Sequence, residues 1–121
     1  HTPVMEDIGV EQQLDIFEKL NQMGSLHAVV DTHELLKNPT AVLTELCANL
    51  DIPYDPAMLT WPAGPRPEDG VWAPYWYKNV HKSTGFAPPP TEEKIIPESL
   101  QPLLESCMPI YEILFESAIK S

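Results

Sequence analysis

Basic residues are scarce in this 121-residue chain, in which 7 Lys and Arg stand against 18 Asp and Glu for a formal net charge of −11 at pH 7. A strongly negative surface opposes non-specific binding to nucleic acid and to anionic lipid. We therefore expect neither a nucleic-acid partner nor a membrane partner.

Long apolar runs and cysteines are also few. No run approaches the ~18 apolar residues of a transmembrane helix, and no basic segment followed by an apolar one forms a secretory signal. Cys47 and Cys107 fall on apolar faces of expected helices, which indicates core residues in a reducing compartment; a disulfide between them is the alternative. We expect a cytoplasmic protein. The start at His1, with Met5 as the first methionine, suggests a fragment, a processed chain or a cloning boundary.

Common catalytic and phosphate-binding motifs are missing. The sequence contains no GxxxxGK(S/T), GxGxxG, GxSxG or HExxH pattern. The four histidines do not show metal-ligand spacing; they are His1, His27, His33 and His81. The chain therefore predicts no metal site and no phosphate loop of its own.

Among the features that are present, residues 26–31 predict a strand. They follow a turn signal at Gly24 and are mostly apolar, which is typical of a strand buried on both faces in a parallel sheet. A lone strand of this kind leaves its backbone groups unpaired. Its neighbours must come from a preceding segment, from another chain, or from a strand hidden among the apparent loops.

Three helices are expected, over residues 8–23, 39–50 and 97–119. Asn38 and Pro39 form a cap followed by proline, a strong helix start. Pro109 must kink or split the last helix. The order of helix, strand and helix indicates a single, partial α/β domain over residues 1–121.

A few polar residues near the expected strand have two interpretations. Asp31 and Glu34 are either a carboxylate pair or, as we favour, a solvated strand end and turn. Tyr54 and Tyr111 are expected to pack in the interior.

Residues 61–91 form a Trp- and Pro-rich loop with a short helix, and its second part differs from the rest of the chain. Residues 71–91 contain no Asp or Glu, and five of the ten aromatic residues lie there. Cations, hydroxyls and glycine amides suit a phosphate or sulfate, and tryptophans suit a purine. The candidates are Lys78, His81, Lys82, Ser83, Thr84 and Gly85 for the anion and Trp72 and Trp76 for stacking. The alternative is an aromatic anchor that holds the loop to the core, with solvated lysines.

Two stretches carry a family resemblance. The first is VVDTHELLKNPTAVLTELCANLDIPYDPAMLTW, and the second is WPAGPRPEDGVWAPYWYKNVHKSTGF. Together they resemble the C-terminal half of bacterial sulfotransferase-like proteins, which have a three-layer fold of the P-loop nucleoside-triphosphatase type. The resemblance implies that the phosphate-loop half lies outside these residues and supplies the missing strands.

The resemblance also implies a function. Such proteins use phosphoadenosine phosphosulfate (PAPS) as the sulfuryl donor, and a late basic segment helps to hold its nucleotide phosphates. That segment corresponds to residues 78–85, without the Arg-Lys-Gly wording of better-known members. We expect a part that binds the donor and shapes the site of a small-molecule acceptor, inactive alone. The alternative is a non-enzymatic domain that binds a protein through its Trp/Pro loop.

Overall fold

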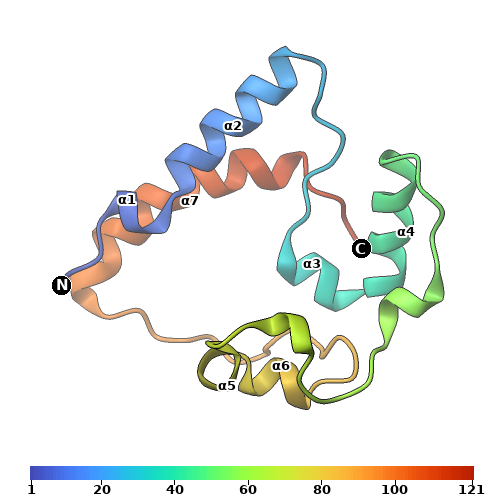
Figure 1. Cartoon of the computed structure of the whole chain (residues 1–121). Coiled ribbons are helices and arrows are strands. Elements are labelled where there is room, and N and C mark those ends of the chain that lie inside the picture. Colours follow the sequence, from blue (N-terminus) through green and yellow to red (C-terminus); the bar gives the residue numbers. More distant parts are fainter.

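The computed structural model describes residues 1–121 and is helical, with no assigned β-strand (Figure 1). The elements in chain order are α1 (Met5–Ile8), α2 (Val10–Gln22), α3 (Thr32–Lys37), α4 (Pro39–Asn49), the 3-10 helices η1 (Pro56–Leu59) and η2 (Pro67–Asp69), α5 (Ala73–Trp76), α6 (Lys78–Lys82), the 3-10 helix η3 (Glu98–Leu100) and α7 (Gln101–Glu116). None of the helices is both long and apolar enough to cross a membrane.

The predicted helix over residues 8–23 corresponds to α2, and the short helix α1, which shares only Ile8 with it, precedes it. Gly9 lies between them with a φ of 79°, a left-handed conformation that glycine adopts without the steric cost of a side chain. Gly24, just beyond α2, has a φ of 69° and turns the chain toward the extended segment. Helix α2 lies along α7 (Figure 1).

Residues 26–31 run extended, but the strand expected there stays a prediction. The segment makes an isolated parallel bridge between Val29 and Ala118, and the Ile119 amide donates to the Val29 carbonyl at 3.0 Å. Its one ladder contact is therefore with the chain's own C-terminal end. The expected helix over 97–119 is shorter in the structure, because α7 spans Gln101–Glu116, Ser117 forms a turn and Ala118 makes the bridge to Val29.

Side-chain caps begin α3 and α4. Asp31 Oδ1 accepts from the Glu34 amide at 3.1 Å and starts α3, a helix where the sequence predicted only a turn. Asn38 Oδ1 accepts from the Ala41 amide at 3.1 Å, so α4 starts at Pro39, the predicted position. Both caps satisfy an amide that has no partner within its helix.

The core is small, and its members lie on α3, α4, α5, the end of α7 and the residues that follow α7. Only 7 of the 121 residues are buried; they are Glu34, Val42, Cys47, Ala73, Leu114, Ala118 and Ile119. Cys107 is only partly buried, and both cysteines are free thiols. The accessible surface is 9329 Å², against about 6,600 Å² for a compact monomer of this mass. A large apolar surface is thus left without protein contacts.

Candidate functional site

The two lysines of the predicted anion site lie on the short helix α6. Lys78 and Lys82 begin and end this helix and are four residues apart, so their side chains project from the same face. Both are exposed, and neither has a carboxylate within 4 Å. They are therefore free to meet an anion.

His81 lies on the same helix but is already bonded. Its Nε2 lies 2.9 Å from Asp69 Oδ2, which also accepts from the Arg66 amide at 2.9 Å. The Arg66 amide, followed by the His81 hydrogen bond, lowers the pKa of Asp69 below its usual value. The ring fastens the loop of η2 to α6, an interaction that the sequence analysis did not foresee.

Ser83, Thr84 and Gly85 also have internal partners. The Ser83 hydroxyl donates to the Val80 carbonyl at 2.6 Å and accepts from Trp61 Nε1 at 2.8 Å. The Thr84 carbonyl accepts from the Trp61 amide at 3.0 Å. A side chain at position 85 would meet the Leu59 carbonyl oxygen at 3.1 Å, so close packing accounts for Gly85.

Trp72 and Trp76 form a stacked pair at the other end of this region. Their ring centroids are 5.6 Å apart with an interplanar angle of 15°. Their exposures are 61% and 71%, so the outer ring faces are open to a planar ligand or to another protein. Trp61 packs edge-on against Phe86 at 5.3 Å. Both residues belong to the loop, so an aromatic anchor between the loop and the core stays a prediction.

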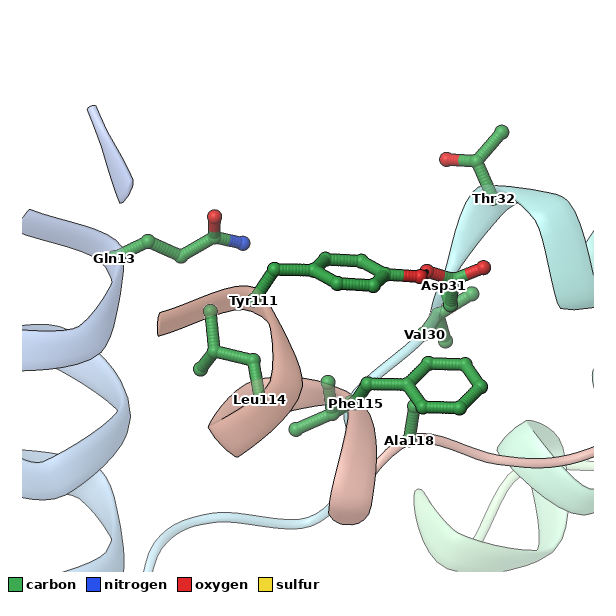
Figure 2. Close-up of a pocket in the computed structure, with 9 residues that line it drawn as sticks. Gln13, Val30, Asp31, Thr32, Tyr111, Leu114, Phe115 and Ala118 are labelled. Atoms are coloured by element: carbon green, nitrogen blue, oxygen red, sulfur yellow. Dashed lines mark hydrogen bonds between the residues drawn. The ribbon is translucent and has the colours of Figure 1, made fainter. Parts of the chain in front are cut away.

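A second candidate site lies where the extended segment meets α7 (Figure 2). The Tyr111 hydroxyl donates to Asp31 Oδ2 at 2.6 Å. Beside this pair is a half-open cavity of about 170 Å³. In Figure 2 the Gln13 side chain extends from α2 toward Tyr111, and Phe115 lies below the phenol ring. The two rings stack with centroids 5.7 Å apart.

The hydrogen bond shifts the acidity of both partners. Burial raises the pKa of Asp31, but hydrogen bonds from the Tyr111 hydroxyl and from the amides of Glu34 and His33 outweigh it, so the pKa lies below its usual value. The same hydrogen bond, with burial and the charge of Asp31, raises the pKa of Tyr111 to about 12. At neutral pH the pair is therefore a carboxylate and a neutral phenol.

The sequence patterns did not predict this second site. Asp31 and Glu34 do not face each other as an acid–base pair, because Glu34 is buried against Lys37 at 2.8 Å and Ser121 at 3.1 Å. Tyr111 stacks on Phe115, but it is 39% exposed and hydrogen-bonded to Asp31, whereas packing in the interior was expected. The available sequence signal was Asp31 as a helix N-cap residue. Its hydrogen-bond partner Tyr111 lies 80 residues away, so the sequence did not indicate that pair. No group of three or more His, Cys, Asp or Glu side chains is arranged to hold a metal ion.

Comparison with known proteins gives one family and two relatives. Residues 4–118 match the family described as "Sulfotransferase domain". Two Arabidopsis thaliana proteins, named "Branched-chain-amino-acid aminotransferase-like protein 1" and "protein 2", are 46% and 44% identical to 94% of this chain. The matched part is 20% of each relative, so the chain spans about one fifth of their length. No solved structure matches.

Proposed function

The chain belongs to the sulfotransferase-domain family, and from that premise we propose that it helps to bind the nucleotide phosphates of a PAPS-type donor and to shape the acceptor site of a sulfotransferase-like protein. Membership implies a P-loop-like fold and, in general, PAPS as donor. The names of the plant relatives concern proteins about five times longer and add no argument about this part.

The observation that supports donor binding is the free lysine pair on α6. Lys78 and Lys82 project together from a segment without a carboxylate, in a chain of net charge −11. The other anion candidates have less to offer, because His81 is bonded to Asp69 and Ser83 lies between Trp61 and Val80. We therefore assign the phosphate contact to the two lysines.

The two lysines fit the charge of nucleotide phosphates, which PAPS would bring together with the sulfuryl group for in-line transfer. An ammonium group that lies near the phosphates stabilises their negative charge and orients the nucleotide. The exposed faces of Trp72 and Trp76 offer a stacking surface for a purine. We assign no catalytic base among residues 1–121, and we therefore propose that this chain alone is inactive.

The extended segment supports a further part of the proposal, that strands from outside these residues complete the sheet. Within residues 26–30, the Val29 carbonyl is the one backbone group that forms a hydrogen bond with another backbone group. Val30 is 40% exposed although its side chain is apolar. Unpaired backbone groups on an apolar segment are costly to bury without partners. We propose that the remaining part of the protein, or another chain, provides the neighbouring strands.

The donor assignment is tested by titrating adenosine bisphosphate into the complete polypeptide by calorimetry. Replacing both lysines, as Lys78→Ala and Lys82→Ala, removes two charge-assisted contacts and weakens binding about tenfold or more. The affinity of the unaltered protein also falls as salt is added, because screening weakens contacts between exposed charges.

The matched control is a double variant with the same loss of charge elsewhere, Lys19→Ala with Lys94→Ala. Both residues are exposed and have no carboxylate partner within 4 Å. The control retains its affinity within about twofold, because neither of its lysines belongs to α6. Equal weakening in both double variants would show only a general charge effect and would remove the assignment to α6.

A second candidate function is a protein-interaction domain, and the exposed aromatic cluster favours it. Tyr75 is 73% exposed and Val71 is 80% exposed beside the stacked tryptophans. Clustered aromatic side chains are typical centres of protein interfaces. An interaction domain would show no adenosine bisphosphate binding, and Trp72→Ala with Trp76→Ala would abolish co-purification of the partner while leaving the fold unchanged.

A further inference from the structure

We propose that the cavity beside Asp31 and Tyr111, defined here as the Asp31 pocket, binds a primary ammonium group carried on a small apolar body. The pocket is separate from the lysine pair on α6, and neither the family match nor the relatives' names assign it a ligand.

The pocket carries a negative charge. The Asp31 carboxylate is its one charged lining group, and no Lys or Arg lines it. Asp31 has no ion-pair partner within 4 Å. Two lysines are held by other groups: Lys37 lies 2.8 Å from Glu34, and Lys120 donates to the carbonyls of Phe115 and Ala118 and lies 4.2 Å from the centre of the Phe115 ring. The negative charge at Asp31 is therefore available to a cationic ligand.

The polar atoms of the pocket can accept further hydrogen bonds. Asp31 Oδ2 accepts one hydrogen bond from Tyr111, and Oδ1 accepts one from the Glu34 amide. Each carboxylate oxygen has a second lone pair, and the phenol oxygen is an acceptor as well as a donor. An ammonium group carries three donors and no acceptor, which matches this set better than an alcohol or an anion does.

The lining of the pocket is mostly apolar, and its volume suits a small ring. Six of the nine lining residues are hydrophobic, and Val30, Leu114 and Phe115 lie together below Asp31 and Tyr111 in Figure 2. The cavity of about 170 Å³ is close to the roughly 150 Å³ that holds a benzene ring in an apolar cavity. The body of the ligand is thus a ring or a chain of about six carbon atoms.

The position of the pocket gives it a role. Asp31 follows the carboxyl end of the extended segment, and ligands of open α/β sheets bind outside the carboxyl ends of the strands. The pocket would then hold the amine-bearing end of the acceptor. This role rests on the proposed function, whereas ammonium binding does not.

The test is a calorimetric titration of the complete polypeptide with benzylamine at neutral pH and without donor. Benzyl alcohol and benzoate are the matched probes, with the same ring and a neutral or anionic head. We expect benzylamine to bind at least about tenfold more tightly than either, because only its head group donates a charge-assisted hydrogen bond to the carboxylate.

The variant Asp31→Asn removes the charge but keeps an N-cap side chain of equal quality for α3. It reduces benzylamine affinity at least about tenfold and leaves benzyl alcohol within twofold. Tyr111→Phe keeps the ring and the carboxylate and frees one oxygen of Asp31, so it retains or strengthens benzylamine binding.

The proposal is overturned by any of these results: no benzylamine binding, equal binding of benzylamine and benzyl alcohol, or unchanged benzylamine affinity in Asp31→Asn. Failure of the proposed function has a different signature, because adenosine bisphosphate would then fail to bind while the benzylamine result stands. Loss of benzylamine binding in Tyr111→Phe would move the anchor from the carboxylate to the phenol and would equally reject the assignment.

Discussion

Two parts of the chain are held together by different means. The helical part, residues 1–55 and 97–121, contains six of the seven buried residues, and the loop part, residues 56–91, contains only Ala73. The loop part depends instead on polar contacts, in which Trp61 bonds to Ser83 and Asp69 bonds to His81. Apolar burial therefore stabilises the helical part, and a hydrogen-bond network shapes the loop part.

The difference bears on how each part functions. A hydrogen-bond network without much burial fixes the backbone around α6 while leaving Lys78 and Lys82 in water. The helical part instead presents an apolar face and unpaired backbone groups at residues 26–30. One part is thus suited to meet a small anion, and the other to dock against further protein.

The largest effect is expected in the helical part. Leu114→Ala in α7 removes a buried side chain that is 9% exposed and lowers the free energy of unfolding of the complete polypeptide by about 3 kcal/mol. Chemical denaturation measures this loss. Ile113→Ala is the matched control on the same helix. Because Ile113 is 47% exposed, we expect its replacement to lower the free energy of unfolding by less than about 1 kcal/mol. Equal costs would mean that α7 is not packed as described.

A smaller and more local effect is expected in the loop part. Trp61→Phe keeps an aromatic ring against Phe86 but removes the indole donor to Ser83, which costs about 1 kcal/mol. Hydrogen exchange across residues 60–85 becomes faster, while global unfolding changes little. Trp72→Phe, on an exposed ring without a hydrogen bond, leaves exchange unchanged. Faster exchange in both variants would argue against the network.

The smallest effect is the pH dependence of the Asp31–Tyr111 contact between the extended segment and α7. The lowered pKa of Asp31 contributes stability at pH values above its unfolded pKa, and this is lost as the pH falls through the folded pKa. The raised pKa of Tyr111 contributes stability below its ordinary value of 10.0, and this is lost as the pH rises toward about 12.

Tyr111→Phe should therefore lower the stability by a small amount near neutral pH, with the difference vanishing at both acidic and alkaline extremes. Thermal unfolding over a pH series measures the difference. Tyr54→Phe serves as control, because the Tyr54 hydroxyl makes no hydrogen bond within the chain and its removal has no such pH profile. A flat difference for Tyr111→Phe would show that the contact is absent in solution.

Local signals explain which features were predictable. Asn38 and Pro39 cap a helix by contacts within three residues, and α4 starts there. The break at Gly9 was also local, but a continuous apolar stripe through residues 10–20 favoured one helix. The contacts that define the two sites join residues far apart: Asp69 with His81 across 12 residues, and Asp31 with Tyr111 across 80. No periodic pattern records such pairs.

The same limit applies to the extended segment. Its apolar composition predicted a strand with neighbours on both sides, and the structure contains one bridge, to Ala118 at the C-terminal end. The sequence indicates that residues 26–30 need partners, because four of these five side chains are apolar and His27 is the exception. It does not record which chain supplies them.

Hydrogen exchange at the amides of residues 26–30 tests the central claim, that this segment is a sheet strand completed from outside the chain. We predict strong protection in the complete polypeptide and exchange near the rate of an unstructured peptide in residues 1–121 alone, because a ladder protects amides only where partners exist. Equally fast exchange in both would contradict the account.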